Sequence, residues 1–404
     1  MPFRLALSGL NAASADLSVT ANNVANVATT GFKESRAEFA DLYAQTQQGV
    51  SSTAIGNGVR IADVAQQFTQ GNIDFTDNNL DLALSGSGFF VLSEEGALSY
   101  TRAGAFRKDN AGYITNNSGQ RLQGYAPVAT GGFNTGGLTD IQLTTNESPP
   151  QATTNVDVLA NLPANATAPT VTPFDPTDQT TFTRATSFTA YDSLGAAHTA
   201  TMYFSKTATT NTWETRLYVD GNAVGGAQTM AFSDAGALVN PATGVFTLPP
   251  YTPATGAAPM NLSLNFAGST QFGETFAAPT KQYGFTTGRL IGIDVDATGI
   301  VQARFTNGRS IGLGQVAVAN FTNPQGLSQL GDTKWAETFA SGQPQMGQAG
   351  DSGFGVMQSG ALEASNVDIT EQLVNMITAQ RNFQANAQMI STADAITQTI
   401  INIR

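Results

Sequence analysis

The stretch that decides the fold is residues 366–404, which read NVDITEQLVNMITAQRNFQANAQMISTADAITQTIINIR. It contains neither proline nor glycine, and apolar residues recur in it at helical spacing. Asp368 is a good N-cap residue, and Glu371 stands three positions later, as in a capping box. The pattern predicts a helix from about residue 369 to residue 401, roughly 50 Å long at ~1.5 Å per residue. A helix of that length is longer than one globular domain needs, which indicates a helical partner.

The start of the chain carries a matching pattern. One row of residues stands seven apart, and a second row of smaller residues lies beside it. The first row is Phe3, Leu10, Leu17 and Val24, and the second is Ala6, Ala13, Thr20 and Val27. In the C-terminal stretch the corresponding apolar residues are Ile369, Leu373, Met376, Phe383, Ile390, Ile396 and Ile400. Both ends of the chain are therefore expected to be long apolar-striped helices.

Charge is scarce in both stretches. Between positions 369 and 400 the charged residues are Glu371, Arg381 and Asp394 alone, whereas soluble proteins average ~25% charged residues. A face of Asn, Gln, Ser, Thr and Ala is able to lie against other protein without burying unpaired charge. We expect the terminal helices to pair with each other and to pack against further copies. The alternative is that they are two ordinary amphipathic helices of one core.

Composition limits the classes of function. The 404 residues suggest several domains, and the absence of cysteine excludes disulfides and zinc–cysteine sites. A net charge of −12 argues against nucleic acid and anionic membrane surfaces as partners. No run of 18 apolar residues exists, so no membrane insertion is expected, and the apolar start is too short to predict a cleaved signal peptide. Only 12% of residues are charged, which fits either a surface occupied by permanent contacts or a β-rich secreted protein.

The order of patterns along the chain predicts a nested α+β, multidomain organisation with the termini together in an elongated subunit. We expect a coiled-coil-like helical part from residues 1–30 and 362–404, and a connector from 31–70 and 322–361. We also expect an inner β domain from 71–146 and 281–321, and an outer, inserted β domain from 147–280. Gly31 fits the residue that follows a helix, the first half of 32–70 favours a short helix, and 322–365 favours loop.

Short polar segments between apolar runs predict hairpin turns. They lie at residues 94–96, 109–112, 192–195, 220–222 and 296–299. The stretch from Asp294 to Gly299 resembles the front of a calcium loop, but position 305 is Phe instead of an acidic residue, so a turn is the better interpretation.

No catalytic constellation is found. His198 is the only histidine and falls in an expected strand, which favours a structural role over a catalytic one. The Ser85–Gly88 segment lacks the third glycine of a dinucleotide site. Trp213 and Trp335 are interpreted as packing residues rather than as carbohydrate-binding ones. We therefore expect no enzyme activity, no cofactor and no metal site.

Three motifs resemble the bacterial flagellar rod and hook proteins. The first is ANNVANVATTGFK at residues 21–33, which contains Asn22, Asn23, Asn26, Gly31 and Phe32. The second is ALSGSGFF at 83–90 with YTRAGAF at 100–106. The third runs from GALEASNVD at 360–368 to AQRNFQAN at 379–386, with Asn366, Asp368, Gln380 and Arg381. The insertion at about 147–280, with TAYDSLGAAH at 189–198, is similar to the hook members of the family.

This resemblance implies a subunit of a helical tube, the flagellar hook, that transmits motor torque while it bends as a universal joint. It implies many copies of the chain as partners, together with the distal rod protein, the hook cap, the hook–filament junction proteins and the flagellar type III export apparatus. The expected location is the extracellular part of the basal body–hook complex. Two glycine-rich connectors, 49–58 and 342–355, are expected to absorb changes of angle.

Two other functions remain open at this point. A distal rod protein of the same family would form a straight tube and would not need residues 147–280. A secreted β-rich adhesin or binding module would be a monomer with a ligand site in 147–280.

Overall fold

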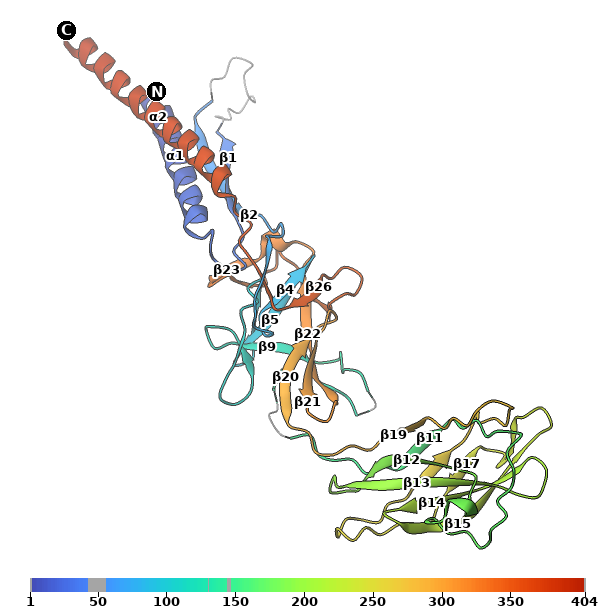
Figure 1. Cartoon of the computed structure of the whole chain (residues 1–404). Helices are drawn as coiled ribbons and strands as arrows, with labels where there is room; N and C mark the ends of the chain where they lie inside the picture. The colour runs from blue at the N-terminus through green and yellow to red at the C-terminus, as the bar shows by residue number, and fades with distance from the viewer. Residues whose placement is uncertain (1, 43–55, 130, 144–146, 403–404) are drawn as a thin grey trace. The chain divides into compact units, whose positions relative to one another are not determined.

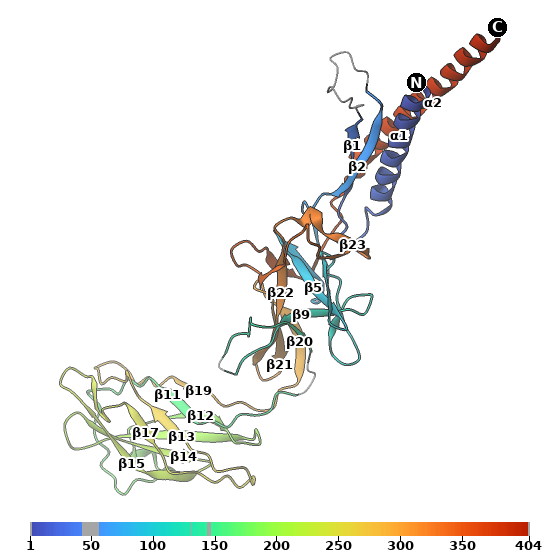
Figure 2. The same ribbon diagram turned by 180° about the vertical axis from the view of Figure 1, so that it is seen from behind.

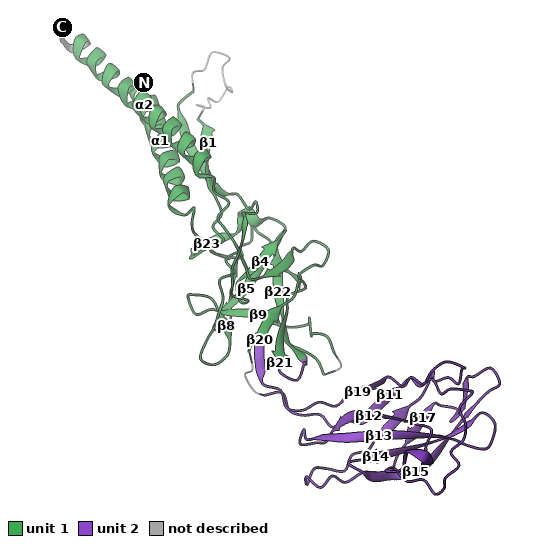
Figure 3. Cartoon of the chain, viewed as in Figure 1, with its two compact units in different colours: residues 1–145, 292–304, 310–404 green, residues 146–291, 305–309 purple. Residues whose placement is uncertain are grey.

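The computed structural model describes residues 2–42, 56–129, 131–143 and 147–402. The chain forms two compact units (Figure 3). Unit 1 consists of Met1–Thr145, Gly292–Arg304 and Ser310–Arg404, and unit 2 consists of Asn146–Ile291 and Phe305–Arg309. Both ends of the chain therefore belong to unit 1, whereas unit 2 comes from its middle. The glycine-containing connector around Gly49 lies outside the described residues.

A long helix stands at each end of the chain, as predicted. Helix α1 is Pro2–Ala25 and helix α2 is Ile369–Asn402. They lie side by side in both views of the molecule (Figures 1 and 2). Asp368 begins α2 as an N-cap, because its Oδ1 accepts hydrogen bonds from the backbone N–H groups of Thr370, at 2.7 Å, and Glu371, at 3.2 Å.

The interpretation of Gly31 as the residue that ends the first helix is wrong. Helix α1 ends at Ala25, and the chain then follows a series of turns. Gly31 does adopt a positive φ of 69°, but its role is close approach. A Cβ atom at this position would lie 2.5 Å from the backbone nitrogen of Ala103. Glycine is required here because another segment of unit 1 packs directly against its backbone.

The short helix expected after residue 32 is a strand instead. Strand β1, Ser35–Asp41, pairs antiparallel with β2, Val59–Gln66, with a bulge between Glu38 and Phe39. The sequence SRAEFAD contains good helix formers, but its pairing with β2 and its contacts with α1 override that local preference.

Unit 1 is built around a large, mainly antiparallel sheet in which β5 and β22 are central. Its strands are β5 (Phe89–Glu94), β6 (Ala97–Thr101), β7 (Arg107–Lys108), β8 (Ile114–Thr115), β9 (Arg121–Tyr125), β10 (Thr139–Asp140), β20 (Leu290–Val295), β21 (Ile300–Phe305), β22 (Ser310–Asn320), β23 (Ser328–Gly331), β24 (Lys334–Ala336) and β25 (Gln345–Gln348). Phe90 and Leu92 pack in one apolar cluster, and Phe89 and Val91 pack in another. Both faces of β5 are buried, which explains its uninterrupted apolar sequence.

The prediction of a loop at 322–365 is wrong, because this segment contains five short strands, of which β23, β24 and β25 belong to the large sheet. A 3₁₀ turn, Pro324–Gly326, precedes β23, and two further strands follow β25. Strand β26 (Val356–Ser359) pairs with β4 (Leu82–Ser85), and β27 (Ala361–Glu363) pairs with β3 (Ile73–Phe75). Strand β25 pairs with β22, so residues 342–355 are tied into the sheet and are not the free connector that the glycine content indicated.

Unit 2 contains two sheets that share one core. The first has the order β12 (Arg184–Tyr191), β13 (Ala197–Lys206), β14 (Thr212–Val219), β15 (Asn222–Phe232) and β16 (Leu238–Asn240). The second has the order β17 (Val245–Thr247), β18 (Ser263–Asn265), β11 (Asn155–Val158) and β19 (Thr280–Gln282), and a 3₁₀ turn spans Gln179–Thr181. Side chains of both sheets form a single apolar cluster with Trp213, Phe204 and Phe266 at its centre. Burial alternates along β14, as expected of a strand with one face on a core.

The predicted hairpin turns are confirmed. The segments at 94–96, 109–112, 192–195, 220–222 and 296–299 join β5 to β6, β7 to β8, β12 to β13, β14 to β15 and β20 to β21. In the last of these the carboxylate of Asp296 accepts hydrogen bonds from the backbone of Thr298 and Ile300, both at 2.9 Å. That turn geometry accounts for the sequence that resembled part of a calcium loop.

Candidate assembly surface

The contact between α1 and α2 is made by small and polar side chains. On α1 the buried residues are Ala6, Ala13, Thr20 and Asn23, and on α2 they are Gln372 and Ala379. The first three are the second, smaller row of the N-terminal pattern. Small side chains let two helices approach closely but bury little apolar area.

Gly9 lies at the same contact, opposite Asn386. A Cβ atom on Gly9 would lie 2.6 Å from the side-chain oxygen Oδ1 of Asn386. The helices therefore approach so closely at this point that no side chain larger than hydrogen fits without movement of Asn386.

Of the large apolar residues predicted for subunit packing, four of those described are exposed and six are half-buried. Exposed fractions are 51% for Phe3, 47% for Ile369, 47% for Leu373 and 56% for Ile396. Leu10, Leu17, Val24, Met376, Phe383 and Ile390 are half-buried, and the side chain of Ile400 lies outside the described residues. The structure thus brings the small row together inside the chain and leaves much of the large row uncovered.

Further exposed apolar residues on the helices were missed by the sequence reasoning. Leu5 and Leu7 on α1 are 38% and 41% exposed, and Val374, Ile377 and Met389 on α2 are 59%, 50% and 48% exposed. They stand outside the seven-residue rows that carried the prediction. Their signal in the sequence was the shortage of charge around them, which leaves no strongly charged face for solvent.

Two asparagines of the family motifs hold together the end of α1, the start of α2 and the strands beside them. The amide of Asn23 accepts from the backbone nitrogen of Ser35 at 3.0 Å and donates to the carbonyl of Ser35 at 2.8 Å and to Oε1 of Gln372 at 3.1 Å. Asn366 accepts from the backbone nitrogen of Glu34 at 2.7 Å and donates to the carbonyl of Gln67 at 2.9 Å. These two amides join α1, the β1–β2 hairpin and the start of α2 by satisfying backbone groups that would otherwise be buried without partners.

The other motif residues lie either in the segment that follows α1 or on the surface of α2. Asn26 donates to the carbonyl of Asn22 at 2.9 Å and accepts from the hydroxyl of Thr29 at 3.1 Å, so it shapes the turn that follows α1. Phe32 is half-buried. Gln380 and Arg381 are exposed on α2, where their side chains are available to a neighbouring molecule.

A buried ionic cluster lies where the two ends of the chain meet. Nζ of Lys33 is 2.6 Å from Oε1 of Glu363, and a guanidinium nitrogen of Arg102 is 3.3 Å from Oε2 of the same carboxylate. Glu363 is fully buried, and Lys33 and Arg102 are nearly so. Lys33 also donates to the carbonyl of Thr69 at 2.7 Å, and the backbone nitrogen of Gly71 donates to Glu363 at 3.0 Å.

Burial lowers the pKa of Lys33 from its ordinary value, although Glu363 acts in the opposite direction. The cluster therefore depends on a single carboxylate that serves two cations and one amide. Each of the three charged residues lies within one of the three family motifs, but the sequence reasoning did not single them out, because their partners are far away along the chain.

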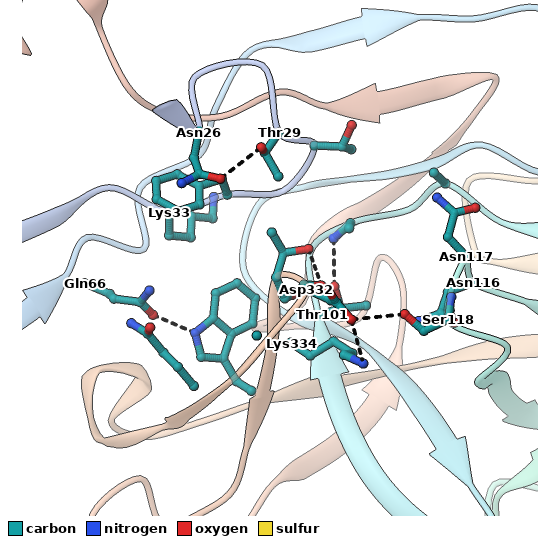
Figure 4. A pocket seen from close by; sticks show the side chains of 18 residues that line it. Asn26, Thr29, Lys33, Gln66, Thr101, Asn116, Asn117, Ser118, Asp332 and Lys334 are labelled. Atoms are coloured by element: carbon teal, nitrogen blue, oxygen red, sulfur yellow. Dashed lines mark hydrogen bonds and ion pairs between the residues drawn. The ribbon is translucent and has the colours of Figure 1, made fainter. Parts of the chain in front are cut away.

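A cavity of about 520 Å³ opens beside this cluster, between the turn after α1 and the β sheet of unit 1. Figure 4 shows its lining of amide, hydroxyl and ionic side chains. Within it, the indole nitrogen of Trp335 donates to Gln66 at 2.6 Å, and Lys334 is 3.5 Å from Asp332. Trp335 is buried in an apolar cluster and thus serves packing, as predicted. The lining suits contact with polar protein groups or water.

His198 belongs to a separate polar group in unit 2. Its Nδ1 is 2.5 Å from Asp220 Oδ2 and its Nε2 is 3.2 Å from Asp192 Oδ2. Asp192 also accepts from the hydroxyl of Thr255 at 2.7 Å. The histidine sits on β13 and joins two hairpin turns, the one between β12 and β13 and the one between β14 and β15, which is the arrangement of a structural residue.

Two searches of the described residues bear on other functions. No group of three or more His, Cys, Asp or Glu side chains that could hold a metal ion is found among them. Neither α1 nor α2, as far as it is described, combines the length and apolar character that a membrane-crossing helix needs.

Four family models match the chain, in the order expected for its nested organisation. They are "Flagella basal body rod protein" at residues 3–33, "Flagellar hook protein FlgE/F/G D1 domain" at 83–173, "Flagellar basal body protein FlaE D2 domain" at 161–285 and "Flagellar basal body rod FlgEFG protein C-terminal" at 358–403. The first and last models coincide with the two segments that form the helix pair.

Similar full-length proteins carry one name. The flagellar hook protein FlgE of Escherichia coli K12 is 38% identical, with 100% of both chains covered. Hook proteins of Salmonella typhimurium and Borreliella burgdorferi are 37% and 32% identical, covering 100% and 98% of this chain and of their own lengths. A crystal structure of Helicobacter pylori flagellar hook protein FlgE2 aligns with a TM-score of 0.54 at 14% identity, over 72% of this chain and 100% of that one, and supports the same fold.

Proposed function

This chain belongs to the flagellar hook protein family, and from that premise we propose that its copies assemble into the flagellar hook through their paired terminal helices. The chain is a structural subunit of the hook and not an enzyme. The observation that carries the proposed mode of assembly is a difference in burial between the small and the large side chains of the helices. Small residues fill the contact inside the chain, and large apolar residues remain exposed around it.

The exposed residues supply the driving force. Full burial of a Leu, Ile or Phe side chain contributes about 1.5–3 kcal/mol relative to exposure. At least seven such side chains on the described helix residues are more than a third exposed, among them Phe3, Leu373 and Ile377. Contact with copies on either side would bury them, and the scarcity of charge means that little desolvation of ions opposes it.

Torque transmission requires that the helix pair be rigidly joined to the β part of the same unit. The ionic cluster of Lys33, Arg102 and Glu363 and the amides of Asn23 and Asn366 provide this connection. We infer that an inner tube of helix pairs resists twist, whereas the β parts slide past their neighbours when the tube bends. Residues 345–348 of the segment 342–355 pair with β22, so bending is assigned to contacts between copies and not to that segment.

The remaining partners follow from a place in the hook. The distal rod protein would contact the polymer at its base, and the hook cap and the hook–filament junction proteins at its growing or finished end. Delivery outside the cell would use the flagellar type III export apparatus, without cleavage of the N-terminus. The division of the chain into helical, connector, inner β and outer β parts stays a prediction alongside the two compact units.

The proposal is tested by assembly of the purified chain. We expect electron microscopy to show tubes that bend, with helices innermost. The double variant Leu373→Gln/Ile377→Gln should keep the circular dichroism spectrum of the folded monomer, because both residues are exposed, and should fail to assemble. The matched control is Val239→Gln, which changes a 56% exposed residue of unit 2 and should assemble normally. A wild-type chain that remains monomeric under all assembly conditions would refute the proposal.

A further inference from the structure

Phe339 is the most exposed large apolar residue among those described. Its exposed fraction is 106%, so its ring makes no contact that shields it from solvent. Other phenylalanines of the same unit, such as Phe89 and Phe90, are 2% and 0% exposed. Phe339 stands between β24 and β25, away from both helices in sequence, and no part of the proposed helical assembly accounts for it.

The turn that carries Phe339 is held firmly. The hydroxyl of Thr338 donates to the carbonyl of Gly326 at 2.5 Å, and the amide of Asn323 donates to the carbonyl of Ala340 at 3.1 Å. The side chain of Ser341 is fully buried and bonds both the backbone nitrogen and the carbonyl of Thr338, at 2.9 Å each. A turn fixed on both sides of Phe339 holds the backbone that carries the ring in place, which lowers the part of the entropy cost of a contact that comes from ordering the backbone.

The turn is bonded to Gly326, and the strand that follows Gly326 lies at an exposed edge of its sheet. Strand β23, Ser328–Gly331, is the last strand of its sheet and pairs with β24 alone, and all four of its residues are exposed. Leu330 on this strand is 56% exposed, and residues 322–331 contain no charge. Exposed edges in monomeric proteins are usually blocked by charged residues. We call β23 together with Phe339 the edge patch.

We infer that the edge patch is a contact surface for a second copy of this chain. The inference deepens the proposed function and rests on it. In a helical polymer each contact joins two different surfaces of the same chain, so every subunit must present such a patch. The chain carries a net charge of −12, so copies repel one another at long range, and an uncharged patch is where their close contact costs least. The patch also belongs to unit 1, the unit whose helices carry exposed apolar residues.

Photo-crosslinking identifies the occupant directly. A Phe339→p-benzoylphenylalanine chain is mixed with a ¹⁵N-labelled wild-type chain, assembled and irradiated. We expect adducts that join a light peptide containing position 339 to a heavy peptide of another copy, in polymer and not in dilute monomer. Polymers whose adducts join peptides of one copy only, or that form no adduct, would overturn the inference.

A substitution series measures the strength of the contact. Phe339→Ser should raise the monomer concentration needed for assembly about tenfold or more, because buried phenyl surface contributes at least that factor. Phe339→Leu should assemble at close to the wild-type concentration, because leucine keeps an apolar side chain. Phe272→Ser, which changes a 48% exposed ring of unit 2, should leave that concentration unchanged. Equal assembly of Phe339→Ser and wild type would refute the inference while leaving the proposed function intact. Failure of the wild type to assemble would remove both.

Discussion

The helix pair of unit 1 and the two-sheet core of unit 2 bury apolar residues in opposite ways. In unit 2, Trp213, Phe204 and Met230 are completely buried in a cluster made by that unit alone. In the helix pair, the fully or nearly buried residues are alanines, a threonine and amides, and the large apolar side chains are half-buried or exposed. One region completes its core within a single chain, whereas the other would complete it with neighbouring copies under the proposed mode of assembly.

This difference indicates where folding and assembly are coupled. A core that excludes water by itself gives a two-state unit that is indifferent to concentration. A helix pair with a thin contact of small side chains is marginal alone and gains most of its stability from association. The following predictions test that contrast, from the largest expected effect to the smallest.

The largest effect is expected at the ionic cluster. Glu363→Gln keeps the shape of the side chain but leaves Lys33 and Arg102 buried without a counter-charge. We expect the free energy of unfolding of unit 1 to fall by about 3–5 kcal/mol, the usual cost of removing one partner from a buried ion pair. Urea unfolding followed by two probes, Trp335 fluorescence for unit 1 and Trp213 fluorescence for unit 2, should show a shift in the first transition only.

The control for this prediction is Glu38→Gln. Glu38 lies 2.8 Å from Arg36, but the two side chains are 44% and 65% exposed. A solvent-exposed pair contributes at most about 1 kcal/mol. If Glu38→Gln lowered the free energy of unfolding as much as Glu363→Gln, burial would not be the reason that the ionic cluster stabilises unit 1.

A smaller effect is expected inside the helix contact. Gly9→Leu places a side chain where Asn386 now lies, so the helices must separate or Asn386 must move. Overpacking of this kind costs about 1–3 kcal/mol. In the monomer, amide hydrogen exchange in α1 should accelerate, whereas Asn11→Leu, at an exposed position of the same helix, should leave it unchanged. Unaltered exchange in Gly9→Leu would mean that the two helices do not depend on this close approach.

The smallest effect is expected in the pH dependence of unit 2. Burial acts to lower the pKa of His198, but its hydrogen bonds to Asp220 and Asp192 outweigh burial and raise the pKa above the ordinary 6.5. Burial acts to raise the pKa of Asp192, but hydrogen bonds from Thr255, Ala196, His198 and Leu194 lower it to about 2. A raised histidine pKa stabilises the fold below pH 6.5 and loses that contribution as pH rises through the folded value. A lowered aspartate pKa stabilises above pH 3.8 and loses its contribution as pH falls toward 2.

The thermal midpoint of unit 2 should therefore be highest between about pH 4 and 6.5 and decline on both sides. His198→Gln should remove the alkaline decline. Unit 1 contains no histidine, since the single one stands at position 198, so its midpoint should not share that decline. Scanning calorimetry across the pH range separates the two transitions, and an alkaline decline that persists in His198→Gln would assign it to another group.

Local patterns in the sequence predicted the elements that depend on local chemistry. The apolar rows gave both helices, and the Asp–Gly segments gave the hairpin turns, because turn residues set the backbone conformation themselves. The strands of three or four residues between 328 and 363 were missed, since runs this short between glycines carry no usable periodicity. The helix expected after residue 32 failed because pairing with β2, a tertiary contact, decided its conformation.

The assembly surface was predicted only in part. A seven-residue repeat marks a stripe but does not tell whether its partner is the same chain or another one. The structure shows that Ala6 and Ala13 of the small row are buried within the chain, and the assignment of the exposed large residues to neighbouring copies stays a proposal. The ionic cluster had no local signature at all: Lys33 and Glu363 are 330 positions apart, and each alone reads as an ordinary surface charge.

The distance along the chain between Lys33 and Glu363 affects when the ionic cluster forms. Lys33 is made early and its carboxylate partner is made late, so the cluster cannot close until the chain has been made as far as Glu363. Closure of so long a loop is slow and is rewarded only at the end. Until then the two cations favour solvent, and the segment stays open. The cluster is therefore one of the later contacts of unit 1 that chain order permits, and it can close as soon as Glu363 is present, before helix α2 is complete.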